Sequence, residues 1–188
     1  MTQNMKPEEV ICHTDIKNLD LLPSNIELSK AELIMISKIG REFILKNKLE
    51  DLKNMYDYIL IDNSPSLGLL TINSLMASDY IIAPTDATYL AMRGLEILIE
   101  TVNEIKKFNN DLEFLGVIVT MFDIRTTHHN EVLKELKNRY PVFNSIIKRS
   151  IKFPDSCLSY FSIFDYAGNS FQGSRAYMEI AEEVIAHE

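Results

Sequence analysis

Short apolar runs, separated by turn-forming residues, mark the strands that this sequence predicts. The strongest is Phe114 to Met121, which is rich in β-branched residues. Ile59, Leu60 and Ile61 form a continuous apolar segment, which is typical of a strand buried on both faces of a parallel sheet. The other predicted strands are Leu19–Leu22, Tyr80–Ala83 before Pro84-Thr85-Asp86, Ile146–Ile147 and, more weakly, Phe161–Phe164.

Apolar residues spaced three or four positions apart predict helices between these strands. Ser29 and Glu32 have the spacing of a capping box, so the first helix is expected to begin near Ser29. Gly40 is expected to divide this region into two helices, of which the second ends near Asn54. The remaining predicted helices are Leu67–Ala77, Leu95–Phe108, Val132–Tyr140 and Ala176–Ile185.

The alternation of strands and helices predicts the fold class. It favours an α/β fold with a mostly parallel sheet, helices on both faces and right-handed crossovers. The sequence shows no internal repeat, low-complexity tract or linker, and its 188 residues suffice for one hydrophobic core. We therefore expect a single domain over residues 1–188.

Composition narrows the classes of partner. With 46% hydrophobic and 24% charged residues, the chain has the make-up of a globular protein. Its formal charge of -8 should repel nucleic acid and anionic lipid, so any DNA contact requires a local basic patch. Cys12 and Cys157 lack metal-ligand spacing, and no window is apolar enough to span a membrane, which favours a cytoplasmic protein with reduced thiols.

Polar residues that follow the predicted strands are the candidates for chemistry. Asp62 stands at the carboxyl end of the Ile59–Ile61 run and is followed by Asn63 and Ser64. Open α/β sheets bind ligands at this edge, although Asp, Asn, Ser and Pro also form ordinary turns. Later loops contain Asp123 and Arg125, and then Lys148, Arg149 and Ser150. Such a set suits a magnesium-phosphate ligand, but it is also what polar loops commonly contain.

Basic residues gather near one predicted loop. Lys148, Arg149 and Lys152 could contact the phosphates of a nucleotide or of a DNA backbone, or could simply be solvated. The basic residues on the preceding helix fit a solvated helix face. His128 and His129 are adjacent on a predicted helix start, so they point in different directions and do not favour a shared metal.

The stretch from Tyr56 to Leu98, YDYILIDNSPSLGLLTINSLMASDYIIAPTDATYLAMRGLEIL, carries a family resemblance. It resembles the ParA family of chromosome and plasmid partitioning ATPases, within the wider ParA/MinD deviant-Walker P-loop group. Three further segments are also similar to the family: LDLLPSNIELSKAEL, GVIVTMFDIRT and GSRAYMEIAEEV. The resemblance therefore runs from about Pro7 to the end of the sequence.

The resemblance implies roles for the candidate residues. Asp62 corresponds to the Walker B acid, which acts on magnesium through water, and Asn63 to Gly68 correspond to the switch that follows it. Residues near the nucleotide base would be Met121, Asp123, Lys148, Arg149 and Ser150, and contacts to non-specific DNA would come from Arg149 and Lys152. The chain departs from the family pattern at Asn63-Ser64, where Cys/Thr-Pro is usual, and at Lys148, where proline is usual.

The resemblance also implies ligands and partners: ATP and Mg²⁺, a centromere-binding ParB-type protein, non-specific DNA, and a homodimer or pairing with a complete paralogue. Family members begin with a strand, a KGGxGKT loop and an Asp-x-Asp-Pro motif, and the 188 residues contain neither motif. The similarity thus covers the C-terminal portion of the family and predicts unpaired strand edges.

Without the glycine-rich loop, the phosphates lose their amide cradle and lysine, so the expected function is a ParA-like partitioning protein that cannot hydrolyse ATP alone. Truncation, a split gene or a displaced gene start would each explain the pattern. The alternatives are a nucleotide-independent module that binds a partner or DNA, and a non-functional remnant.

Overall fold

The computed structural model describes residues 5–187. They fall into two compact units: one combines the described part of Met1–Asp79 with Val102–Glu113, and the other combines Tyr80–Thr101 with the chain from Phe114 onward. The single domain expected from the sequence stays a prediction. No helix among residues 5–187 is long and apolar enough to cross a membrane.

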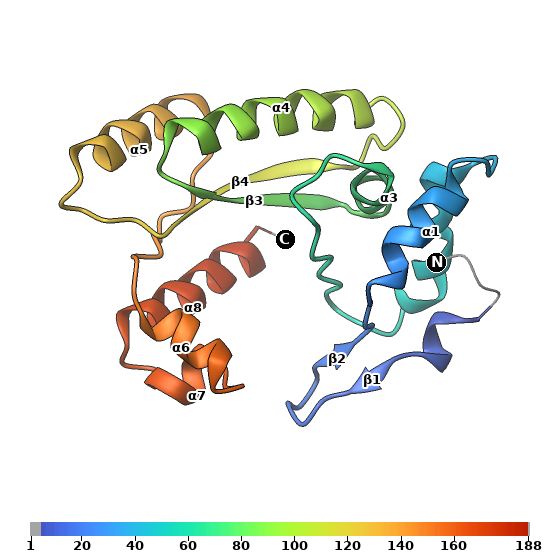
Figure 1. Cartoon of the computed structure of the whole chain (residues 1–188), viewed down its shortest axis with the longest axis horizontal. Coiled ribbons are helices and arrows are strands. Elements are labelled where there is room, and N and C mark those ends of the chain that lie inside the picture. Colours follow the sequence, from blue (N-terminus) through green and yellow to red (C-terminus); the bar gives the residue numbers. More distant parts are fainter. Residues whose placement is uncertain (1–4, 188) are drawn as a thin grey trace. The chain divides into compact units, whose positions relative to one another are not determined.

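The first unit is built mostly from short helices and has a small hairpin at one edge (Figure 1). The hairpin pairs β1 (Cys12–His13) with β2 (Asp20–Leu21) in antiparallel register. The predicted strand Leu19–Leu22 therefore exists as β2, although it pairs locally with β1. The helices are η1 (Pro7–Glu9), α1 (Glu27–Met35), η2 (Arg41–Phe43), α2 (Ile44–Leu49), η3 (Glu50–Leu52) and α3 (Leu69–Ala77).

The start of α1 differs from the prediction. The helix begins at Glu27, and the Asn25 side chain accepts the Glu27 N–H at 2.9 Å. Ser29 lies inside the helix, so the predicted capping box of Ser29 and Glu32 is wrong. An upstream asparagine can supply the acceptor that a helix start needs, and the spacing alone could not show which acceptor was used. The predicted break at Gly40 is confirmed, because Gly40 has a φ of 67°.

A buried asparagine holds α3 in the first unit. Asn73 is 0% exposed. Its side-chain oxygen accepts the Leu45 N–H at 3.0 Å, and its amide group donates to the Arg41 and Leu69 carbonyls at 2.8 and 2.9 Å. Because buried polar groups are costly unless hydrogen-bonded, this one side chain fixes α3 against the start of α2.

Asn109 makes a second buried link in the same unit and provides a stability test. It is 5% exposed, and its amide group donates to the carbonyls of Leu75 and Ser78 at 2.9 and 2.8 Å. Asn109→Ala should lower the free energy of unfolding by about 1–3 kcal/mol, because it leaves two carbonyls without their donor. Urea denaturation measures this, with the exposed neighbour Asn110→Ala as the control. Equal effects of the two substitutions would contradict the assignment.

The second unit contains a parallel sheet covered by helices (Figure 1). β3 (Tyr80–Asp86), α4 (Tyr89–Ile105) and β4 (Glu113–Thr120) follow in order, as predicted for a crossover. Pro84 does not end the strand as expected, since β3 continues to Asp86. The remaining helices are α5 (Thr127–Arg139), α6 (Lys152–Leu158), α7 (Ile163–Ala167) and α8 (Gln172–Ile185).

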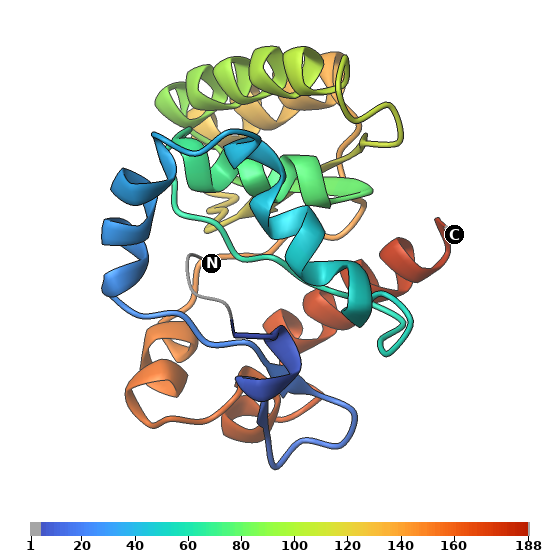
Figure 2. The same cartoon turned by 90° about the vertical axis from the view of Figure 1, so that its right-hand side faces the viewer.

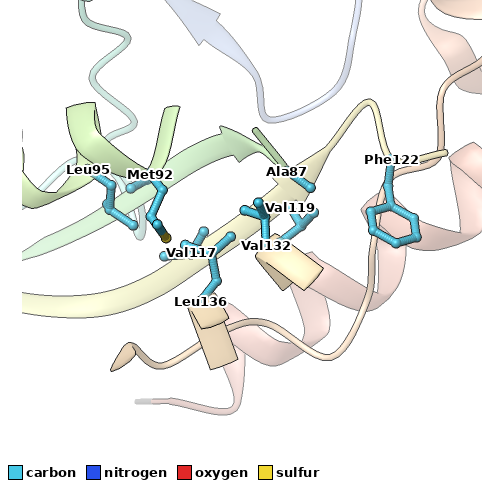
Figure 3. Packing of buried hydrophobic residues seen from close by; sticks show 9 residues of the cluster. Ala87, Met92, Leu95, Val117, Val119, Phe122, Val132 and Leu136 are labelled. Carbon is cyan, nitrogen blue, oxygen red and sulfur yellow. The ribbon is translucent and has the colours of Figure 1, made fainter. Parts of the chain in front are cut away.

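Apolar side chains cover both faces of this sheet. On one face, side chains of β4 pack against α4 and α5, which lie side by side in both views (Figures 1 and 2). The cluster members labelled in Figure 3 are Ala87, Met92, Leu95, Val117, Val119, Phe122, Val132 and Leu136. On the other face, Leu115 packs with Ala176 and Ile180 of α8. Helices on both faces of a parallel sheet make this an α/β fold, as predicted.

A third extended segment lies beside β4. Val117 bridges to Val142 and Phe122 to Lys148, both in parallel orientation, and the Ile147 N–H donates to the Val119 carbonyl at 2.9 Å. The predicted strand Ile146–Ile147 is therefore present only as part of an irregular ladder. At Gly116, with φ 152°, an added Cβ would lie 2.9 Å from the Pro141 carbonyl oxygen, so glycine permits this close approach.

Two predicted strands are wrong. Phe161–Phe164 runs into α7, whose first turn is capped by the Ser162 hydroxyl accepting the Asp165 N–H at 3.1 Å. Residues Ile59–Ile61 belong to no strand, and Leu60 is 89% exposed. An apolar run becomes a strand only when a neighbour pairs with it, and among residues 5–187 no strand is paired with Ile59–Ile61. The helix α6 was not predicted.

Candidate nucleotide and DNA site

Asp62 and its neighbours form a polar loop in the first unit. The side chains of Asp62, Asn63 and Ser64 are exposed. Asn63 donates its side-chain amide to the Ile61 carbonyl at 3.1 Å, and the Ser64 and Ser66 hydroxyls lie 2.8 Å apart. These local contacts leave the Asp62 carboxylate at the surface, where it could meet a hydrated cation.

Two hydrogen bonds hold the end of this loop, where α3 begins. The Thr71 hydroxyl, which is buried, donates to the Ser66 carbonyl at 2.6 Å. The Leu69 N–H donates to the Glu32 carboxylate of α1 at 2.7 Å. The sequence analysis did not include Thr71 or Glu32 in the candidate site. Glu32 and Leu69 are 37 residues apart, so no local pattern in the sequence indicates their contact.

A second group of predicted site residues comes together in the other unit. Phe122 bridges to Lys148, and the Arg149 N–H donates to the Phe122 carbonyl at 3.0 Å. This ladder places Met121 and Asp123 beside Lys148, Arg149 and Ser150, at the carboxyl ends of adjacent parallel segments. Met121 has φ 49°, in the left-handed region that residues other than glycine seldom adopt.

The Asp123 carboxylate is engaged by Arg125. Arg125 donates from Nε at 3.0 Å and from Nη2 at 2.7 Å, and its backbone N–H also bonds to Asp123 at 3.0 Å. Hydrogen bonds from the Arg125 side chain, followed by its backbone, hold the pKa of the Asp123 carboxyl well below its usual range. Asp123 is therefore ionised at neutral pH and already paired, which limits its capacity to accept a further hydrogen bond from a nucleotide base.

His129 has a local structural role. Its Nδ1 accepts the Asp123 backbone N–H at 3.1 Å, so the neutral ring carries its proton on Nε2. This contact orders the turn between β4 and α5.

The basic residues Lys148, Arg149 and Lys152 are exposed. The Ser150 hydroxyl accepts the Lys152 N–H at 3.2 Å, and Lys152 Nζ lies 4.6 Å from the centre of the Phe171 ring. A cation over an aromatic face is partly ordered without losing its charge. All three basic side chains are therefore accessible from solvent, and their contact with phosphate groups stays a prediction.

The described residues fit magnesium-ATP only in part. The exposed Asp62 carboxylate suits a water-mediated contact with Mg²⁺. Among residues 5–187, however, no group of three or more His, Cys, Asp or Glu residues lies close enough to hold a metal ion. The 188-residue sequence contains no GxxxxGK[ST] loop to bind the phosphates. These residues by themselves therefore do not form a complete magnesium-nucleotide site.

Comparison with known proteins decides the family. A family model described as "AAA domain" matches residues 1–114. The sporulation initiation inhibitor protein Soj of Bacillus subtilis is 40% identical over 182 residues, covering 95% of this chain and 72% of Soj. The chain belongs to the ParA/Soj family of partitioning ATPases. The resemblance inferred from the sequence is confirmed.

Solved structures of other proteins share the fold of this chain. Cobyrinic acid a,c-diamide synthase from Mycobacterium smegmatis, with bound ADP and magnesium, matches with a TM-score of 0.81 and 33% identity, covering 98% of this chain and 68% of that chain. A plasmid partition protein from Borrelia burgdorferi matches with a TM-score of 0.74 and 27% identity, covering 98% and 69%. The chain spans 57% of the length of a Mycobacterium tuberculosis relative that is 38% identical to it.

Proposed function

We propose that this chain is a ParA-like partitioning protein whose 188 residues do not hydrolyse ATP by themselves. The match to Soj over 95% of the chain carries the proposal, together with the lack of a phosphate-binding loop in the same 188 residues. The chain would act in ATP-dependent DNA segregation only when another polypeptide segment supplies that loop.

In this proposal, Asp62 is the acid that acts on Mg²⁺ through water, and Asn63 and Ser64 begin the switch that follows it. Met121, Asp123, Lys148, Arg149 and Ser150 would lie near the nucleotide base. The clustering of the second group beside β4 supports a shared role.

The proposed partners are a centromere-binding ParB-type protein, non-specific DNA, and a second copy or a complete paralogue. The place of action would be the cytoplasm, on the nucleoid where DNA is bound. The exposed basic side chains Arg149 and Lys152 would provide the DNA contacts, since the overall charge of -8 opposes DNA binding elsewhere.

Charge reversal tests the DNA contacts. Arg149→Glu with Lys152→Glu should weaken retention on non-specific DNA at low salt and reduce the slope of log affinity against log salt by about 0.9 for each phosphate that is no longer neutralised. The matched control is Lys134→Glu with Lys137→Glu, two exposed lysines of α5 with the same change in net charge. DNA retention that falls equally in both pairs, or in neither, would contradict the proposed contacts.

A nucleotide-independent interaction module remains the second candidate, and the lack of a phosphate-binding loop in these 188 residues favours it. The two functions differ in their need for nucleotide. The test measures how well the 188-residue chain is retained on DNA when a complete ParA-type protein is also present. If the chain is a partitioning protein, ATP and Mg²⁺ should change its retention. If it is a nucleotide-independent module, they should not.

A further inference from the structure

The first turn of α3 receives its hydrogen-bond acceptor from another helix. The first N–H groups of a helix lack intrahelical partners, and an acceptor just upstream commonly satisfies one of them. Here the preceding residue is Gly68, which has no side chain to offer. The Glu32 carboxylate of α1 takes this place and accepts the Leu69 N–H at 2.7 Å.

Gly68 makes room for this carboxylate. A Cβ on Gly68 would lie 2.5 Å from Glu32 Oε1. The Gly68 backbone has φ -84° and ψ -173°, which any residue can adopt, so close approach explains the glycine and backbone conformation does not. The atom in the way is the end of a flexible side chain, and alanine at position 68 would displace the carboxylate while leaving the backbone in place.

The segment Asn63–Gly68 is anchored mainly at its Gly68 end. There, Thr71 binds the Ser66 carbonyl and Glu32 binds the Leu69 N–H. At the other end, the exposed Asn63 makes a local contact with the Ile61 carbonyl. We infer that Glu32 is a positioning residue that holds the first amide of α3 and so fixes where the segment Asn63–Gly68 ends.

The meaning of this segment as a switch rests on the proposed function, whereas the contact made by Glu32 does not. A shift of α1 relative to α3 would pass directly to the segment, because one carboxylate connects them. A carboxylate near the positive end of a helix dipole also adds an electrostatic contribution. Glutamine would keep the acceptor oxygen at position 32 but lose the charge.

Amide hydrogen exchange measured by NMR on the full chain tests the inference without nucleotide or DNA. Glu32→Ala should accelerate exchange of the Leu69 amide about tenfold, since hydrogen bonds to charged groups contribute roughly that much. Glu32→Gln should have a smaller effect. The Leu45 amide, bonded to Asn73 in the same unit, should keep its rate and serves as the internal reference.

Two matched comparisons separate positioning from general stability. Glu27→Gln, on the same helix and ion-paired with Lys30, should leave the Leu69 amide unchanged. Gly68→Ala should accelerate that amide as Glu32→Ala does, and the double variant should be no faster than either single one, because both remove the same contact.

Three results would overturn the inference: an unchanged Leu69 amide in Glu32→Ala, equal acceleration of the Leu45 amide, or additive effects in the double variant. Each can occur whether or not the chain binds DNA or ATP. Failure of the positioning role is therefore distinguishable from failure of the proposed function.

Discussion

The purified 188-residue chain should hydrolyse ATP no faster than its own Asp62→Ala variant. Removing one preorganised donor from an active site costs about 100- to 1,000-fold in rate, and a chain without a phosphate-binding loop lacks several such donors at once. Asp62 cannot compensate, because a carboxylate accepts hydrogen bonds and repels phosphate, whereas the missing groups are donors to phosphate oxygens. Phosphate release in the presence of Mg²⁺ is the measurement, with a complete Soj relative as the active reference.

Equilibrium binding provides the second arm of this test. The dissociation constant of labelled ATP with Mg²⁺ from the 188-residue chain should lie far above the micromolar range, because these residues contain no lysine-bearing loop to hold the phosphates. Micromolar binding, or hydrolysis that Asp62→Ala abolishes, would show that the 188 residues form a working site and would refute this part of the proposal.

Leu136→Ala should destabilise the second unit by about 2–5 kcal/mol, the usual cost of removing a buried leucine side chain. Leu136 is 0% exposed and packs with Val132, Val117 and Val119 between α5 and the sheet (Figure 3). Its loss leaves a cavity that the surrounding β-branched side chains fill poorly, because they have few alternative rotamers. Urea denaturation followed by circular dichroism gives the change in the free energy of unfolding.

Leu90→Ala is the matched control, since Leu90 lies on α4 in the same unit and is 81% exposed. It should change the free energy of unfolding by no more than about 0.5 kcal/mol. If Leu136→Ala lowers the free energy of unfolding by less than about 1 kcal/mol, this core is not tightly packed and the prediction is wrong.

Much of the second unit could be predicted from the sequence. The β-branched run became β4, the spaced apolar residues became α4, α5 and α8, and the strand-helix alternation gave the α/β class. These features depend on periodicity along the chain, which decides which side chains share a face. α6 was missed because a seven-residue helix carries too few apolar repeats to stand out.

The candidate site was predictable in part. Lys148, Arg149 and Ser150 were expected near Met121 and Asp123, and the ladder beside β4 brings them together. The pairing of Asp123 with Arg125, only two residues away, could have been proposed from their spacing but not established, because either side chain could have faced solvent.

By itself, the sequence determined the family and the fold class, because both follow from the order and spacing of residues. Tertiary structure decided which residues met across long separations. It left Ile59–Ile61 outside any strand, since strand formation needs a neighbour that an apolar run cannot reveal. It also gave Glu32, predicted as a partner of Ser29, to the Leu69 amide, because the fold brings this carboxylate to the start of α3, where an N–H lacks an intrahelical acceptor.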